Sequence, residues 1–197
     1  MRRLAIVMAL STAAGLAQAA GPHVHGQGNL DLAMAGGTLL VELSLPAADV
    51  VGFEHAPRND EQTALLEDAL ARLGKGTNVL EPAPDAACKV TRESVHSGLS
   101  GPEGGTGEHD HGEKSHDPDA DHDHDHDHDH DHDHGGHADF EARYRWHCDH
   151  PGKLAWIDVP LLEFLNGVTL KVQLVTDQGA RADTLKAPDT RLSMDVQ

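Results

Sequence analysis

The sequence is poor in aromatic side chains, in basic side chains and in cysteine. Aromatic residues make up 3% of its 197 residues, and 33 acidic residues outnumber 15 basic ones, for a formal net charge of −18. An acid excess of this size repels phosphate backbones and anionic lipid surfaces. We therefore expect neither nucleic acid nor an anionic membrane as a partner.

The motifs of common hydrolases are missing as well. There is no His-Glu-x-x-His and no nucleophile elbow, and Asp-x-His patterns recur trivially in one repetitive segment. A metallohydrolase needs three fixed ligands, an open coordination position and a general base. We expect a protein that is not an enzyme, and a metallohydrolase with one catalytic zinc is the alternative that turnover assays would reveal.

A long apolar run occurs only at the N-terminus. Arg2 and Arg3 precede the apolar residues 4–16, and Ala17-Gln18-Ala19 follows. This is the three-part layout of a secretory signal peptide, so we expect residues 1–19 to be removed after Ala19 and the protein to be exported to the periplasm. The run is too short for a bilayer, which requires roughly 20 residues, so no membrane span is expected in the mature form.

The two cysteines, Cys88 and Cys148, lie far apart in the sequence. In an oxidising compartment an even number of cysteines favours a disulfide over thiolate metal ligands. A bridge closing a loop of this size stabilises by roughly 4 kcal/mol in the chain-entropy model. It would span the histidine-rich segment described below.

The rest of the sequence predicts an α+β domain over residues 20–197. Alternating apolar residues at 30–34 and 38–45 around Gly36-Gly37 predict a hairpin that ends at Pro46, followed by an irregular connection at 47–57. A helix begins at Asn59 or Asp60 and closes at Gly74 and Gly76. Further expected elements are a loop at 77–84, strands at 86–95, 140–148, 154–159 and 168–176, a helical turn at 160–167 and a last strand within 180–196.

These elements favour an antiparallel sheet with two helices on one face. The alternation at 140–148 has a period of two, which places Cys148 on the core side of its strand. Residues 97–137 interrupt the domain with Gly, Glu, Asp and His and hold no large apolar residue beyond Leu99. We expect a disordered His/Asp-rich insert there.

The insert carries the strongest chemical signal. Between residues 121 and 134 the chain reads Asp-His seven times, and eleven of its seventeen histidines lie in the insert. Neutral imidazole binds Zn²⁺, Ni²⁺, Co²⁺ and Cu²⁺, and carboxylate can complete the shell. The predicted ligands are His109, His111, His116, His122, His124, His126, His128, His130, His132, His134 and His137.

Several overlapping sites follow from such a repeat, which predicts several bound ions in fast exchange. Binding weakens below about pH 6, because imidazole must lose its proton to bind a metal. Copper(I) is disfavoured because the repeat has no thiolate. An inert acidic linker is the alternative, but such a linker has no need of histidine.

Three shorter motifs outside the insert are candidate ligands of a tighter site. They contribute His23 and His25 near the new N-terminus, Glu54 and His55 in the connection after the hairpin, and His147 and His150 around Cys148. A pair of histidines on a protein surface often binds no metal. We therefore expect a tighter metal site only where two of these motifs come together in the fold.

In their order along the chain, these motifs resemble the ZrgA-like periplasmic zinc-binding proteins linked to bacterial zinc uptake. The resemblance rests on His23-Val24-His25-Gly26, Gly52-Phe53-Glu54-His55, Cys88, the His/Asp insert and Tyr144-x-Trp146-x-Cys148 with Phe164. It covers essentially the whole mature chain. It implies delivery of Zn²⁺ toward an ABC-type transport system of the inner membrane, and it suggests that the motifs containing His25 and His55 matter.

The hypothesis from the sequence is a binding protein whose insert captures Zn²⁺ and assists uptake. The alternative is a periplasmic buffer that detoxifies nickel, copper or excess zinc. Expression raised by metal excess would favour the buffer, and expression raised by zinc starvation would favour uptake.

Overall fold

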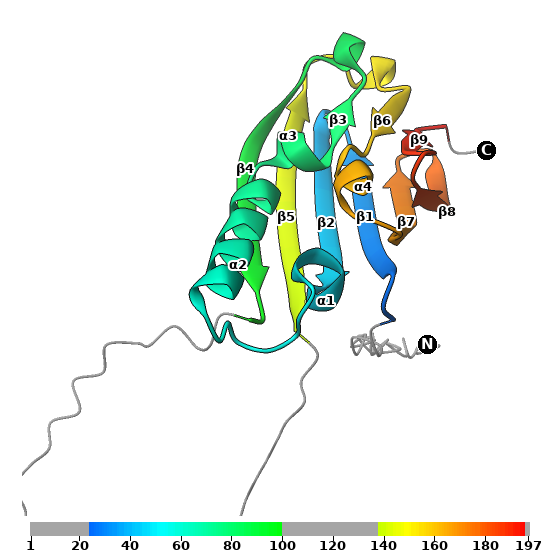
Figure 1. Cartoon of the computed structure of the whole chain (residues 1–197). Coiled ribbons are helices and arrows are strands. Elements are labelled where there is room, and N and C mark those ends of the chain that lie inside the picture. The colour runs from blue at the N-terminus through cyan, green and yellow to red at the C-terminus, as the bar shows by residue number, and fades with distance from the viewer. Residues whose placement is uncertain (1–23, 100–137, 196–197) are drawn as a thin grey trace, which may run out of the picture.

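A computed structural model describes residues 24–99 and 138–195 of the chain. The predicted signal peptide, His23 and residues 100–137 of the insert, with all eleven of its histidines, lie outside the described residues. The described residues form two sheets and four α-helices (Figure 1). None of these helices is long and apolar enough to cross a bilayer.

Six strands form the larger sheet, in the order β4-β5-β2-β1-β7-β8. They are β1 (Gln27–Ala35), β2 (Thr38–Pro46), β4 (Cys88–Ser97), β5 (Asp139–Cys148), β7 (Thr169–Thr176) and β8 (Gly179–Lys186). The predicted hairpin is confirmed, because β1 and β2 pair antiparallel around Gly36-Gly37. The predicted strands at 140–148 and 168–176 are confirmed as β5 and β7.

The expected antiparallel sheet is confirmed for four of the five strand pairs in the larger sheet, but the fifth pair is parallel. Strand β7 pairs parallel to β1, with Gln27 opposite Thr169, so the sheet is mixed. The chain leaves β5 at one end of the sheet and returns to the other end before β7 begins. A connection that crosses the sheet in this way makes the next strand parallel to its neighbour.

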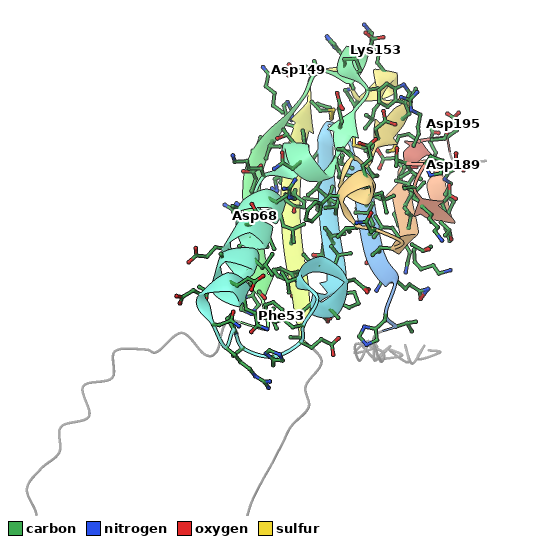
Figure 2. All side chains as sticks on the ribbon, viewed as in Figure 1. Phe53, Asp68, Asp149, Lys153, Asp189 and Asp195 are labelled. Carbon is green, nitrogen blue, oxygen red and sulfur yellow. A yellow bond between two sulfur atoms is a disulfide. The ribbon has the colours of Figure 1, made fainter. Side chains whose placement is uncertain are left out.

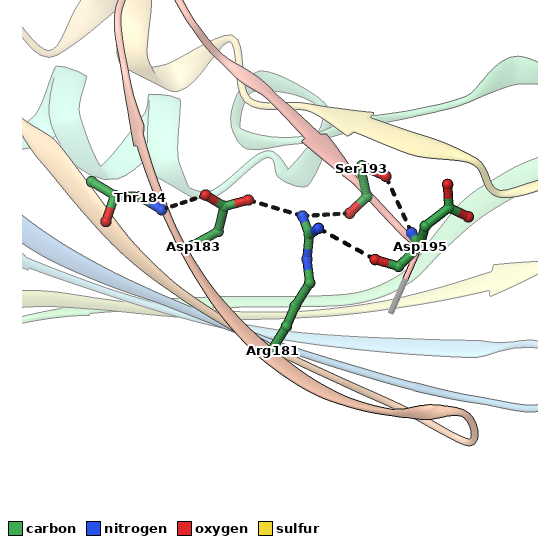
Figure 3. A network of polar contacts seen from close by, with 5 residues as sticks. All are labelled: Arg181, Asp183, Thr184, Ser193 and Asp195. Atoms are coloured by element: carbon green, nitrogen blue, oxygen red, sulfur yellow. Dashed lines mark hydrogen bonds and ion pairs between the residues drawn. The ribbon is translucent and has the colours of Figure 1, made fainter. Parts of the chain in front are cut away.

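A second sheet, which the sequence did not predict, joins β3 (Glu81–Pro82), β6 (Trp156–Asp158) and β9 (Arg191–Ser193). Arg181 of β8 ties the C-terminal segment to the larger sheet (Figure 3). Its guanidinium donates to the Asp183 carboxylate at 2.9 Å and to the carbonyls of Ser193 and Asp195 at 2.9 and 3.2 Å. The tail thus contributes two strands, in two sheets, where one was expected.

The described residues form four α-helices where two were expected: α1 (Ala47–Val51), α2 (Asp60–Leu73), α3 (Gly76–Val79) and α4 (Leu161–Phe164). The predicted helix is confirmed as α2, which Asn59 caps by accepting a hydrogen bond from the Gln62 N–H at 2.8 Å. The helical turn at 160–167 is confirmed as α4.

The irregular connection predicted at 47–57 was wrong in its first part, which is α1. A single turn begins after Pro46 and ends at Gly52, whose φ of +86° only glycine adopts easily. The loop predicted at 77–84 was also wrong, because these residues hold most of α3, all of β3 and the start of a 3₁₀ turn. Such short elements depend on their neighbours and leave no periodic pattern.

The core lies between the larger sheet and the helices, which cover one of its faces (Figure 1). Phe140, Tyr144 and Trp146 of β5 point into it and are at most 3% exposed. The intervening residues of β5 face solvent, as the period of two predicted. On that outer face Arg143 donates to Glu42 at 3.2 Å.

Cys88 and Cys148 form a disulfide, and Cys148 is buried on the core side of β5 as predicted. The bridge does not hold the two ends of the insert, which the β4–β5 ladder joins instead. Ser97 lies opposite Phe140, and the Gly98 N–H donates to the Asp139 carbonyl at 2.8 Å. Ser97 and Leu99, which the composition places in the insert, are buried in the folded part, and Leu99 belongs to the core.

Candidate metal site at the insert end of the sheet

Strand pairing brings several predicted residues to one end of the larger sheet, here called the insert end. β1 begins there beside the end of β2, and Pro46 lies opposite Asp139 at the start of β5. The insert leaves β4 and returns to β5 at the same end. Phe53, which follows α1, also lies there (Figure 2). The folded domain therefore presents His25, Glu54 and His55 where the insert is attached.

His25 sits in a tight turn formed by residues 24–27. The Gln27 N–H donates to the Val24 carbonyl at 3.0 Å, and Gly26 has a φ of +76°. Both sides of the Gly26 residue are held by other parts of the fold. Its N–H donates to Asp49 Oδ2 at 2.7 Å, and its carbonyl accepts from the Thr169 N–H at 2.9 Å. The backbone around His25 is therefore fixed just before β1 begins.

The side chain of His25 meets Glu54. Its Nδ1 lies 3.7 Å from Glu54 Oε1, while the His25 side chain is 63% exposed and that of Glu54 is 25% exposed. Two of the predicted motifs thus come together in the fold. An exposed imidazole beside a half-buried carboxylate is a suitable pair of donors for a divalent cation that arrives from solvent.

His55 follows Glu54 in the sequence, and two contacts hold its ring in a defined orientation. Its ring stacks on Phe53, with centroids 5.3 Å apart, and its Nδ1 lies 2.9 Å from the Ala56 carbonyl oxygen. When Nδ1 carries the proton, it donates to this carbonyl and leaves the Nε2 lone pair available for a metal. A hydrogen bond of this kind is typical of histidines that bind metals through the opposite nitrogen.

His147 and His150 lie at the opposite end of the sheet, where Figure 2 shows Asp149. Nε2 of His147 is 3.7 Å from Asp149 Oδ1, and the backbone N–H of His150 donates to the Ala86 carbonyl at 3.0 Å. The strand length of β5 therefore separates these two histidines from His25 and Glu54.

The described ranges, 24–99 and 138–195, hold no group of three or more His, Cys, Asp or Glu residues arranged to hold a metal ion. His25 and Glu54 are therefore a pair of possible donors without a third His, Cys, Asp or Glu beside them among the described residues. Zinc sites in proteins commonly use three or four protein ligands, and solvent can occupy a remaining position.

Sequence reasoning missed two residues at the insert end. His96 of β4 stands opposite Glu141 of β5 on the exposed face, one residue before the strand ends. Asp49, whose carboxylate accepts the Gly26 N–H, comes from α1. Neither has a sequence signal, because each acquires its neighbour only through strand pairing or helix packing.

Comparison with known protein families identifies the family of this chain. A comparison with curated proteins gives no match. A family model described as "ZrgA family zinc uptake protein" matches residues 22–194, which include the N-terminal turn, the insert and every strand. That family is described by zinc uptake and not by a catalytic activity, in agreement with the resemblance drawn from the motifs. The chain belongs to the ZrgA family of zinc uptake proteins.

Proposed function

We propose that the protein captures Zn²⁺ in the periplasm through its His/Asp insert and passes it to the insert end of the folded domain. From there it assists uptake by an ABC-type transport system of the inner membrane. The observation that carries the proposal is the contact of His25 with Glu54 at the end of the sheet where the insert is attached. Capture and transfer would then take place at one end of the molecule.

The chemistry of the two parts is complementary. The repeat offers many equivalent imidazoles, so any one ion can exchange quickly among them. The domain offers donors on a rigid backbone, and a fixed geometry favours tighter binding than a mobile one. In this proposal His25 and Glu54 bind the transferred ion first, and His23 and histidines of the insert complete its shell, while His55 remains a neighbouring candidate ligand. His147 and His150 remain candidate ligands of a separate site at the far end.

Membership of a zinc uptake family supports delivery over storage or detoxification. Imidazole and carboxylate also bind Ni²⁺, Co²⁺ and Cu²⁺, so selectivity for zinc depends on the geometry of the domain site more than on the repeat. Export through the predicted signal peptide places the protein where metal arrives from outside the cell. The disulfide is consistent with an oxidising compartment.

The test is a competitive zinc titration of the mature full-length chain with three variants. The first replaces the eleven insert histidines by Asn, the second adds His25→Ala to it, and the matched control replaces the seven repeat aspartates by Asn. We expect the first variant to lose all but one or two equivalents of zinc, and the second to lose the tightest of those. The control should keep most of its equivalents, because imidazole is the main ligand.

Binding of equal amounts of zinc by the wild type and the first variant would show that the insert is not the capture site. Complementation of a strain that lacks the protein tests the role in uptake. The wild type should restore growth in zinc-poor medium, and the first variant should do so only partly. A benefit confined to medium with toxic zinc would indicate a buffer instead.

A further inference from the structure

The hydrogen bond between Asp49 and Gly26 links the turn that carries His25 to helix α1. Asp49 Oδ2 accepts the Gly26 N–H at 2.7 Å, and the contact is partly buried. Glu54 follows in the same segment of chain, after the left-handed Gly52. This segment therefore contacts the turn twice, once at the backbone through Asp49 and once at the His25 side chain through Glu54.

Helix α1 is itself held firmly in place. Ala47 is fully buried, and its N–H donates to the carbonyl of Ala138 at 2.8 Å, at the point where the chain returns from the insert. Val51 packs into the core at the other end of the helix. The 24–27 turn runs directly into β1, so the sheet holds its C-terminal side. Asp49 holds the Gly26 N–H of the same turn from helix α1.

We propose that Asp49 is a positioning residue for zinc: it holds the 24–27 turn so that the His25 imidazole faces Glu54. This inference rests on the proposed function, because it assumes that His25 and Glu54 bind the ion. Its physical basis is preorganisation. Without the Asp49 acceptor the Gly26 peptide can rotate, and the imidazole must then be ordered at the moment of binding, which weakens the site.

Two other roles for Asp49 predict different results. As an acidic residue in the first turn of α1 it interacts favourably with the helix N-terminus, a role that concerns stability and leaves zinc affinity unchanged. As a direct metal ligand it would need its negative charge, which an amide does not supply. The positioning role needs only an oxygen that accepts the Gly26 N–H, which Asn retains.

The experiment compares Asp49→Ala, Asp49→Asn and Asp68→Ala in the mature full-length chain. Asp68 is an exposed residue of α2 whose carboxylate pairs only with Arg72 among the described residues, at 3.6 Å, so its substitution removes the same charge far from the turn. Histidines are isotope-labelled, and NMR follows the ring signals of His25, assigned with His25→Gln, during a ZnCl₂ titration. This readout separates the domain site from the insert.

We expect Asp49→Ala to raise the zinc concentration at the midpoint of the His25 shift by about 10-fold, as loss of an outer-shell partner commonly does. Its melting temperature should fall by less than about 5 °C, as for loss of one hydrogen bond in a domain of this size. Asp49→Asn should keep the His25 midpoint within about twofold of the wild type because its amide oxygen still accepts. Asp68→Ala should match the wild type.

An Asp49→Ala midpoint equal to that of the wild type would overturn the inference. An Asp49→Asn midpoint as high as that of Asp49→Ala would also overturn it, because it would indicate direct ligation. If Asp49→Ala does not fold, the Asp49→Asn midpoint decides between positioning and ligation. Wild-type His25 signals that never respond to zinc, while insert histidines do, would remove the domain site from the proposed function and this inference with it. In that case zinc capture by the insert would still stand.

Discussion

Cys88 and Cys148 stand directly opposite each other in the β4–β5 ladder and are joined by a disulfide, at the end of the ribbon remote from the insert. The sequence separation of 60 residues includes the whole insert. The bridge therefore closes a large loop in the unfolded chain without constraining the insert end of the sheet. Stability and metal capture should respond differently to its removal.

Replacing both cysteines by Ala should lower the free energy of unfolding by about 4 kcal/mol, because the unfolded chain regains the entropy of the open loop. Urea unfolding followed by circular dichroism measures this change. Zinc equivalents bound at 10 °C, where the variant should remain folded, should match the wild type. A variant that stays folded but loses its zinc would show that the bridge shapes the metal site after all.

Tyr144 reaches from β5 to the end of α2, where its hydroxyl donates to the Leu73 carbonyl at 2.5 Å. Tyr144→Phe should lower the free energy of unfolding by about 1 kcal/mol, because it leaves a buried carbonyl without this donor. Thermal and urea unfolding at pH 7 measure the loss. A variant as stable as the wild type would show that solvent or another group satisfies Leu73.

The same residue predicts the behaviour in alkali. Burial, with a smaller contribution from Glu93, raises the pKa of Tyr144 well above its usual value of 10.0. The neutral phenol stabilises the fold fully below pH 10, and this contribution is lost as the pH rises above 10, because the unfolded chain ionises first. The stability difference between wild type and Tyr144→Phe should therefore shrink above pH 10. Tyr144 is the only tyrosine of the chain, so absorbance at 295 nm follows its titration directly.

Asp158 and Arg191 join β6 to β9 through two hydrogen bonds of 2.7 Å, and the guanidinium also lies 4.0 Å from the Trp156 ring centroid. The hydrogen bonds from Arg191 lower the pKa of Asp158 below its ordinary value of 3.8. The pair therefore stabilises the fold above pH 3.8, and this contribution is lost as the pH falls through the lowered pKa. Because the Arg191 side chain is 59% exposed, solvent screens the pair and the contribution is small.

Asp158→Asn should lower the melting temperature slightly at pH 7, and the gap to the wild type should close as the pH is lowered below 3.8. Melting curves from pH 7 to pH 2.5 test this, with Asp68→Asn as a control that carries the same charge change on an exposed helix. An equal gap at every pH would mean that Asn disturbs the packing of β9 and that the ion pair contributes nothing.

The elements predicted correctly are those whose pattern is local. The alternation on both sides of Gly36-Gly37, the apolar stripe of α2 behind Asn59 and the period of two in β5 each follow from a few neighbouring residues. The disulfide was also predictable, because two cysteines in a chain with a predicted secretory signal favour a bridge over other roles. Helix α1 was missed, because a single turn has too few residues to show a helical period.

The order of the strands depended on contacts that no local pattern records. The parallel pairing of Gln27 with Thr169 and the small sheet of β3, β6 and β9 arise only when distant segments pack on a common core. The candidate site also has a part that the sequence predicts and a part that only the fold shows. His25 and Glu54 were predicted as separate motifs, while their contact and the role proposed for Asp49 depend on how α1 and the segment after it lie against the turn before β1.

The sequence by itself determined which donor groups this protein carries: a run of imidazoles and carboxylates is a set of potential divalent-metal ligands whatever its fold, because ligand type sets which metals are preferred. Only the tertiary structure decided where that chemistry is applied. It places the ends of the insert, His25 and Glu54 at one end of the sheet, and the disulfide at the other. Position in space follows from strand order and packing, which are properties of the whole chain and not of any segment.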